Sequence, residues 1–116
     1  MAVEMPRARF DELVGEALDL LPRELSRAMT NVVVLVEDIN EMDPDLLGLY
    51  EGIALTERTT SYSGVLPDRI TIYRDPILRI CRDEDQVVDE VAITVVHEIA
   101  HHFGIDDDRL HDLGWA

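Results

Sequence analysis

The stretch DEDQVVDEVAITVVHEIAHHFGIDDD, residues 83–108, predicts one long helix that carries candidate metal ligands. Asp83 followed three residues later by Gln86 is a typical helix start, because these side chains can satisfy the free amide groups of a first turn. Gly104 is a typical helix end, since a residue without a Cβ readily adopts the left-handed conformation that closes many helices. We therefore expect the helix to fill the interval between Asp83 and Gly104.

The two sides of this helix differ in character. Apolar residues recur at three- and four-residue spacing, which at about 100° per residue gives one broad core-facing side. These residues are Val88, Val91, Ala92, Val95, Val96, Ile99 and Phe103. The opposite side carries Glu90, Thr94, His97 and His101. The two histidines are one turn apart, so both imidazoles can reach a single ion.

The segment HEIAH, residues 97–101, fits the pattern H-E-x-x-H. In that pattern two histidines bind zinc, and the glutamate acts as general base on the metal-bound water. We therefore predict that His97 and His101 are zinc ligands and that Glu98 is the catalytic base. A catalytic zinc typically has three protein ligands and one open position, so a third ligand is required.

The third ligand must come from the short segment after His101. Its candidates are Asp106, Asp107, Asp108, His111 and Asp112. Gly104 lets the backbone turn back towards the helix, and Asp107 completes the spacing H-E-x-x-H-x-x-G-x-x-D, so we predict Asp107 as the third ligand. The alternative is that residues 106–108 only cap a last short helix, Arg109 to Leu113.

These residues carry a family resemblance. The motif resembles the H-E-x-x-H-x-x-G-x-x-H of metzincin metallopeptidases, with Asp107 in place of the third histidine. The form ending in aspartate is similar to a small bacterial family of zincin-like metallopeptidases. The likeness extends over most of residues 32–116, through LLGLYEG (46–52), SYSGVLPDRITIY (61–73), PILRIC (76–81) and HDLGW (111–115).

The resemblance implies a zincin-like fold with His97, His101 and Asp107 on zinc and Glu98 as base. The sequence departs from metzincins in one respect. Metzincins place a methionine beneath the metal after the third ligand, whereas the methionines here are at positions 1, 5, 29 and 42.

Composition predicts a single globular domain over residues 1–116. Hydrophobic residues make up 47% of the chain and charged residues 30%, which is typical of a protein that buries a core. The formal net charge of −15 would repel phosphate backbones, so we exclude nucleic acid as the main partner. The acidity either favours basic substrates or keeps the protein soluble, and we expect the second.

Cysteine usage and hydropathy predict a cytoplasmic protein that does not enter a membrane. Cys81 is the only cysteine, so no internal disulfide can form, and we expect it to be a small buried residue. The N-terminus lacks the apolar run of a signal peptide, and no segment approaches about 18 apolar residues.

The rest of the chain predicts an α+β domain, in which a small mixed twisted sheet packs against the long helix together with N-terminal helices. We expect a helix from Phe10 to Leu21 and a second one from Pro22 to about Met29. Val32 to Val36 is a continuous apolar run, which predicts a central strand covered on both faces. Asp43 and Pro44 should start a helical turn that ends at Gly48.

Further on, Leu49 to Arg58 predicts strand pieces broken at Gly52, and Arg69 to Tyr73 predicts a strand with one exposed face. Thr59 to Asp68 is expected to be a loop, and Asp75-Pro76 to start a short helix. Extended substrates of zincins add to a strand edge near the metal-binding helix. The candidates for that edge are Gly52 to Thr56 and Arg69 to Tyr73.

Several polar residues near the motif have two interpretations. We expect His102 to be a packing or surface residue and His111 to lie on the last helix, although His111 could instead donate to an oxyanion. Glu90 and Thr94 either orient a ligating imidazole or form a solvated face. Tyr62 and Tyr73 are expected to pack rather than to stabilise a transition state.

Two functions fit the sequence. The first is a zinc hydrolase that cleaves amide bonds of a peptide or protein substrate. The second is a non-catalytic metal-binding interaction module that retains the fold. Glu98 favours the enzyme, because an inert site needs no acid-base group beside an open coordination position.

Overall fold

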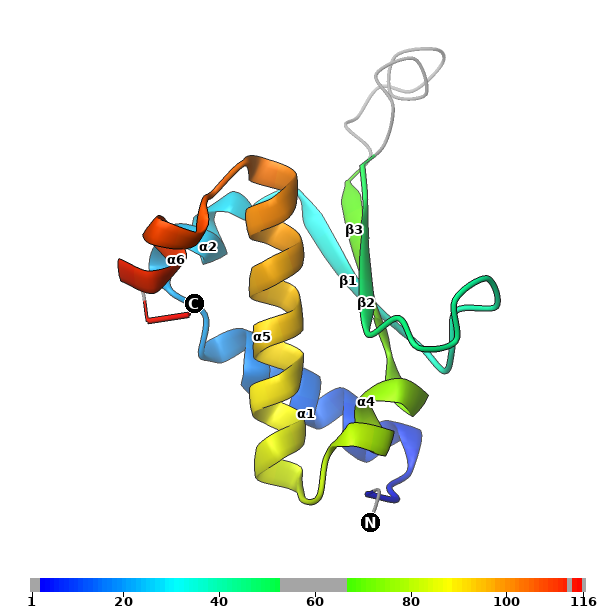
Figure 1. Cartoon of the computed structure of the whole chain (residues 1–116). Helices are drawn as coiled ribbons and strands as arrows, with labels where there is room; N and C mark the ends of the chain where they lie inside the picture. The colour runs from blue at the N-terminus through cyan, green and yellow to red at the C-terminus, as the bar shows by residue number, and fades with distance from the viewer. Residues whose placement is uncertain (1–2, 53–66, 113, 116) are drawn as a thin grey trace.

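The computed structural model describes residues 3–52, 67–112 and 114–115, without the side chain of Asp107. Its elements are α1 (Arg7–Asp19), α2 (Arg23–Ala28), β1 (Val32–Glu37), β2 (Gly48–Glu51), β3 (Asp68–Tyr73), α4 (Arg74–Ile80), α5 (Glu84–Phe103) and α6 (Asp107–Asp112). They form the predicted α+β arrangement, with a small mixed sheet beside a long helix (Figure 1). No helix within these described ranges is long and apolar enough to cross a membrane.

The two ends of α5 are those that the sequence predicts. The Asp83 carboxylate accepts a hydrogen bond from the backbone N–H of Gln86 at 2.8 Å, and the Gln86 side chain accepts one from the backbone N–H of Arg82 at 2.7 Å. Gly104 ends the helix with φ of 70°, a left-handed conformation that is unfavourable for residues with a Cβ. The two caps therefore fix both ends of the helix that carries His97 and His101.

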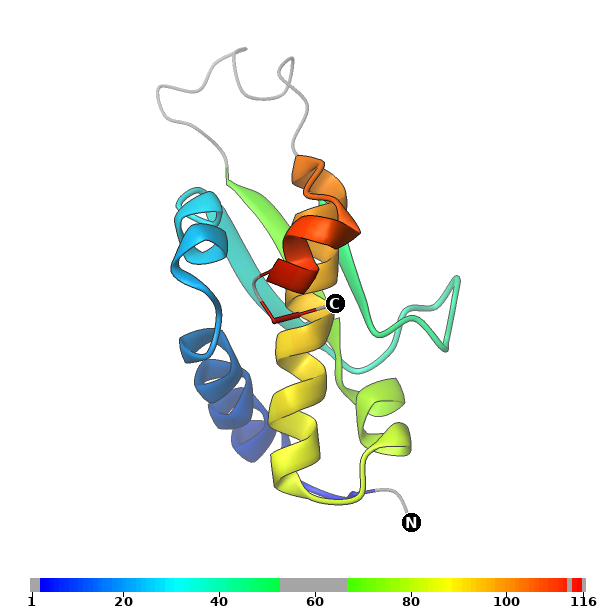
Figure 2. The same ribbon diagram turned by 60° about the vertical axis from the view of Figure 1, so that its left-hand side comes forward.

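Helix α5 runs through the middle of the molecule. It contacts α1, α2 and α4, and it also contacts β2 and β3 of the sheet. Figures 1 and 2 show α5 beside α1, with both helices on the same side of the sheet. The fully buried large side chains come from α1, α2, β3, α4 and α5: Phe10, Leu13, Leu25, Ile70, Ile72, Ile77, Val87, Val91, Val95, Val96 and Ile99.

The predicted core side of α5 needs three corrections. Val88 is only half-buried while Val87 is fully buried, and Phe103 is 46% exposed. Thr94, predicted to lie opposite the core, is only 8% exposed because β2 covers it. The reason is that α5 has neighbours on two sides, so its buried surface is wider than a single apolar stripe.

The sheet has the strand order β1-β3-β2, with β1 parallel and β2 antiparallel to β3. The prediction that Val32 to Val36 is central and covered on both faces is therefore wrong. Among the described strands this run lies at the edge of the sheet as β1, in which Val33 and Leu35 are 41% and 43% exposed. Arg69 to Tyr73 is the central strand, buried on both faces from Ile70 onwards, rather than a strand with an exposed face. The apolar content of a strand does not show whether it has a neighbouring strand on both sides.

The segment before β2 also differs from its prediction. Asp43 and Pro44 do start a turn, with the Leu46 N–H donating to the Asp43 carbonyl at 3.1 Å, but no helix follows. Gly48 begins strand β2 instead of ending a helix. The strand expected from Leu49 is confirmed as far as Glu51, and residues 53–66 lie outside the described part of the chain.

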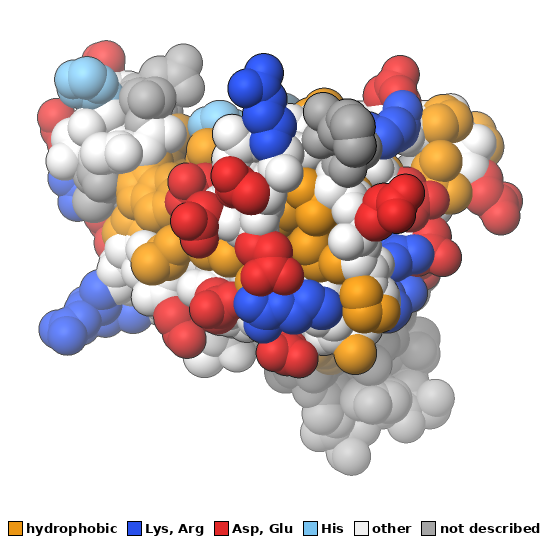
Figure 3. Space-filling view, turned by 90° about the horizontal axis from the view of Figure 1, so that it is seen from below, with side chains coloured by type: hydrophobic (Ala, Val, Ile, Leu, Met, Phe, Trp, Pro, Cys, Tyr) orange, Lys and Arg blue, Asp and Glu red, His pale blue; other side chains and the backbone are white. Residues whose placement is uncertain are grey.

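An ion pair joins the N-terminal helix to the start of α5. Two guanidinium nitrogens of Arg9 donate to the two carboxylate oxygens of Glu84, at 3.0 Å and 2.7 Å. These hydrogen bonds hold the pKa of the Glu84 carboxyl below its usual value. Figure 3 views the end of the molecule at which α5 begins, and it shows acidic and basic side chains interspersed with apolar ones.

Candidate active site

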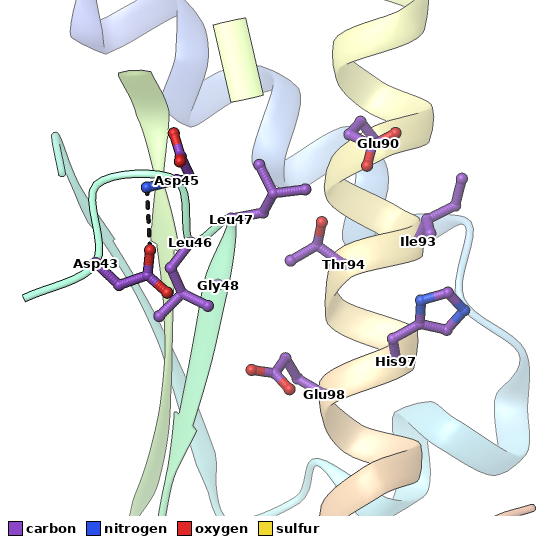
Figure 4. Close-up of a pocket in the computed structure, with 10 residues that line it drawn as sticks. All are labelled: Asp43, Asp45, Leu46, Leu47, Gly48, Glu90, Ile93, Thr94, His97 and Glu98. Carbon is purple, nitrogen blue, oxygen red and sulfur yellow. Dashed lines mark hydrogen bonds between the residues drawn. The ribbon is translucent and has the colours of Figure 1, made fainter. Parts of the chain in front are cut away.

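The three motif side chains that the structure describes all project from the last two turns of α5. His97 and His101 are exposed, and Glu98 is half-buried. Figure 4 shows Glu98 directed towards β2, whereas the ring of His97 is turned away from that strand. Within the described part of the chain, no hydrogen bond or ion pair engages any of these three side chains. They are therefore free to bind an ion or a water molecule.

Two hollows lie between α5 and the β2 side of the molecule, and Glu98 lines both. The first has a volume of about 400 Å³ and is bordered by His97, by Thr94 and by residues of the loop before β2. The second is bordered by His101 and by Tyr50 of β2. Glu98 thus lies where the two hollows meet, with one predicted ligand beside each of them.

The histidines fit a zinc site in part. Two imidazoles that project from one helix one turn apart are a donor pair that zinc accepts. Among the described side chains, no group of three or more His, Cys, Asp or Glu residues lies close enough to hold a metal ion. The side chain of Asp107, the predicted third ligand, is outside that description, so its ligation stays a prediction.

The aspartates after Gly104 have different local roles. Asp106 caps α6, because its carboxylate accepts a hydrogen bond from the backbone N–H of Arg109 at 2.8 Å. Asp107 is the first residue of α6, which spans Asp107–Asp112 rather than the predicted Arg109 to Leu113. Leu110 is buried in the core and anchors this helix. The cap predicted as an alternative for residues 106–108 is therefore confirmed for Asp106.

A cluster of three side chains ties the end of α5 to the sheet. The His102 ring stacks on Tyr50, with 3.9 Å between ring centroids, and the Tyr50 hydroxyl donates to Asp68 at 2.7 Å. The packing interpretation of His102 is thus confirmed. The sequence did not identify Tyr50 or Asp68, because their contact depends on β2 and β3 being neighbours. The apolar pattern of the sequence does not predict that strand order.

The remaining candidates lie as follows. Glu90 and Thr94 line the first hollow beside His97, and the idea that they orient an imidazole stays a prediction. Tyr73 is buried and its hydroxyl accepts a hydrogen bond from Asn40 at 3.0 Å, which confirms its packing role. His111 is exposed on α6. Tyr62 lies outside the described residues.

Cys81 is a buried thiol and not a nucleophile of this site. It is 3% exposed, and burial raises its pKa to about 11, with a further contribution from the carboxylates of Glu90 and Asp83. The thiol is therefore protonated at neutral pH. This confirms the prediction that Cys81 serves as a small buried residue.

Comparison with other proteins places the fold in a family. The solved structure of a conserved hypothetical protein from Thermus thermophilus is similar, with a TM-score of 0.57 and 23% identity over 85% of this chain and 94% of that chain. At this identity the likeness shows the fold alone. No curated protein matches the sequence. Residues 29–115, which include the whole sheet, α5 and α6, match the family described as zincin-like metallopeptidase. The chain belongs to the zincin-like metallopeptidase family.

Proposed function

We propose that this protein is a zinc-dependent metallopeptidase that hydrolyses peptide bonds with Glu98 as general base. The observation that carries the proposal is the position of Glu98 between two hollows, one bordered by His97 and the other by His101. A general base must reach the attacking water and lie beside the substrate. Membership of the family supports this class of reaction without naming the substrate.

His97, His101 and Asp107 would hold the zinc ion. When bound, zinc would polarise the substrate carbonyl and lower the pKa of its water towards about 7. The capping hydrogen bond of Asp106 supports the choice of Asp107. The Asp106 carboxylate already accepts a hydrogen bond from the backbone of α6, which leaves Asp107 as the better candidate for the metal. The turn at Gly104 supports it too, because the chain reverses there before reaching Asp107.

Glu98 would move the proton. Its carboxylate is half-buried and has no ion-pair partner among the described residues, so a neighbouring cation does not hold it away from a water molecule. It would accept the proton of the attacking water and then pass it to the leaving amine. Its direction towards β2 puts this transfer on the side of α5 where an extended peptide can lie (Figure 4).

The outer edge of β2 is the better docking edge for that peptide. Arg69 to Tyr73, one of the two predicted edges, is excluded because β3 pairs with β1 on one side and with β2 on the other. No described strand pairs with the outer side of β2. Gly48 borders the first hollow, and Leu49 and Tyr50 border the second. An extended substrate would add to this edge through main-chain hydrogen bonds. Most of the other predicted edge, Gly52 to Thr56, lies outside the described residues.

A peptide-library assay tests the proposal. Full-length protein loaded with zinc is incubated with a broad peptide library, and the products are identified by mass spectrometry with and without chelator. We expect cleavage that the chelator stops and that added zinc restores. No cleavage by zinc-bound protein would contradict the proposal and favour the non-catalytic metal-binding module.

A further inference from the structure

We propose that the hollow beside His97 and Glu98 receives a basic side chain of the substrate, so that the enzyme cleaves close to a lysine or arginine. This inference rests on the proposed peptidase function. We call this hollow the acidic hollow; it is the first of the two, between α5 and the segment from Asp43 to Gly48.

The charge of the acidic hollow is the first argument. Of the 10 residues that line it, none is Lys or Arg, and four are acidic: Asp43, Asp45, Glu90 and Glu98 (Figure 4). Arg79 pairs with Asp45 at 3.3 Å. Within the described residues, the other three carboxylates have no ion pair. A cationic side chain would therefore meet negative charge that the protein itself does not neutralise.

Thr94 provides a second and independent argument. It is only 8% exposed, and its hydroxyl has no hydrogen-bond partner in the part of the chain that the structure describes. Figure 4 shows its side chain directed from α5 into the space towards β2. A buried hydroxyl without a partner is unfavourable. An ammonium or guanidinium group in the acidic hollow would donate a hydrogen bond to the Thr94 hydroxyl oxygen.

The length of the acidic hollow along α5 indicates which substrate residue would place its side chain there. Glu90 and Glu98 are eight residues apart on one helix, which corresponds to about 12 Å along its axis. Two residues of an extended peptide cover about 7 Å. The four-carbon stem of a lysine covers most of the remaining distance. The basic residue should therefore lie about two residues from the bond that is cleaved next to Glu98.

The overall acidity of the chain offers a competing explanation, because a net charge of −15 attracts any basic peptide. Asp89 separates the two explanations. It is exposed on α5 directly before Glu90, and it does not line the acidic hollow. Asp89→Asn and Glu90→Gln remove the same charge from the same helix. Only the second change should alter the preference for a basic residue.

The test compares peptides that differ at one position, with Lys, Gln or Glu two residues to either side of the cleaved bond. For the zinc-loaded full chain we expect kcat/KM to be roughly 3- to 10-fold higher with Lys than with Gln on one of the two sides. Glu90→Gln and Asp43→Asn should each reduce this ratio, whereas Asp89→Asn should leave it unchanged. Glu90→Gln and Asp43→Asn lie in different segments of the chain, so if one variant misfolds the other still tests the proposal.

A binding measurement with Glu98→Gln keeps the two proposals distinguishable. Fluorescence anisotropy with the same peptides should still show tighter binding with Lys than with Gln, because Asp43 and Glu90 remain in the hollow. The preference should be smaller than in wild type, since this variant lacks the Glu98 carboxylate, and slow turnover keeps the peptides intact during the measurement. Cleavage without any preference for Lys, or an equal loss in Asp89→Asn, would overturn the acidic hollow as a subsite and leave the peptidase function intact. Absence of cleavage together with preferential binding of Lys peptides would overturn the peptidase function and support the subsite.

Discussion

Gly48 of β2 lies so close to Thr94 of α5 that a Cβ added to Gly48 would be 2.6 Å from the Thr94 Cγ2 atom. Real Cβ atoms do not approach a neighbour this closely, so only glycine fits here without a shift of the strand or the helix. Both residues line the acidic hollow. Their contact therefore sets the distance between the strand edge and the helix that carries the motif.

The first prediction follows from this contact. Gly48→Ala should lower the free energy of unfolding by about 1 to 3 kcal/mol, because it overpacks the interface between β2 and α5. Urea denaturation at pH 7 measures this effect. Gly15→Ala is the matched control, since a Cβ at Gly15 in the middle of α1 meets nothing within 4 Å, and it should stabilise by roughly 0.5 to 1 kcal/mol.

A second substitution tests the cause of that loss. Thr94→Ser removes the Cγ2 atom that the new Cβ would meet. Combined with Gly48→Ala, it should recover most of the lost stability. A double variant as unstable as Gly48→Ala alone would show that the clash lies elsewhere.

The second prediction concerns zinc. The protein should bind about one zinc ion per chain, and His97→Ala or His101→Ala should abolish binding. Because ligation requires neutral imidazoles, binding should weaken as the solution is made acidic. Metal analysis after dialysis measures the stoichiometry. His111→Ala, which changes an exposed histidine of α6, should bind zinc as wild type does; stoichiometric zinc in His97→Ala would refute the site.

The third prediction is that the protein stays folded without metal. Its buried core joins α1, α5 and β3 through side chains such as Phe10, Ile70 and Val95, none of which depends on a ligand. Far-UV circular dichroism should therefore change little when a chelator is added, unlike that of a zinc finger. Complete loss of the helical signal would contradict this.

The fourth prediction concerns Cys81. Because its pKa is raised from 9.0 to about 11, the thiolate fraction at pH 8 should be roughly 100-fold lower than in the unfolded chain. The thiol should therefore react more slowly with a disulfide reagent in the folded protein than in urea, because burial reduces both its thiolate fraction and its access to the reagent. Comparable rates in both states would show that Cys81 is accessible.

The same shift predicts how stability depends on pH. Between about pH 9 and pH 11 the folded protein keeps a proton on Cys81 that the unfolded chain has lost. The stabilisation is therefore fully present below pH 9, and it is lost as the pH rises towards 11. Cys81→Ala should remove this part of the pH dependence, whatever its effect on stability at pH 7.

The sequence was most informative where the signals are local. Asp83, Gln86 and Gly104 predicted both ends of α5, because capping depends only on neighbouring residues. The sequence also predicted that His97 and His101 project from one exposed side, since one helical turn sets that spacing. These signals do not depend on how the helix packs against the rest of the chain.

Non-local features could not be predicted in the same way. Val33 and Leu35 belong to an apolar run typical of a central strand, yet they lie on an edge strand, because β3 inserts between β1 and β2. Phe103 continues the apolar spacing of α5 but is exposed, and it meets Tyr50 edge-on at 6.0 Å. The contact between Gly48 and Thr94 likewise joins segments far apart in the chain.

The role of Glu98 is the central claim, and the variant Glu98→Gln tests it. Glutamine cannot accept the proton of the attacking water, and a positioned general base contributes typically about 10²- to 10⁴-fold to the rate. Asp107→Ala should differ by lowering both zinc affinity and turnover, because it removes a ligand. Glu16→Gln, an exposed change on α1, controls for the loss of one negative charge.

The decisive measurement is zinc content and peptide cleavage of wild type and Glu98→Gln in the same preparation. We predict nearly unchanged zinc and cleavage slower by about 10² or more in the variant. Cleavage at the wild-type rate by zinc-bound Glu98→Gln would contradict the proposed mechanism.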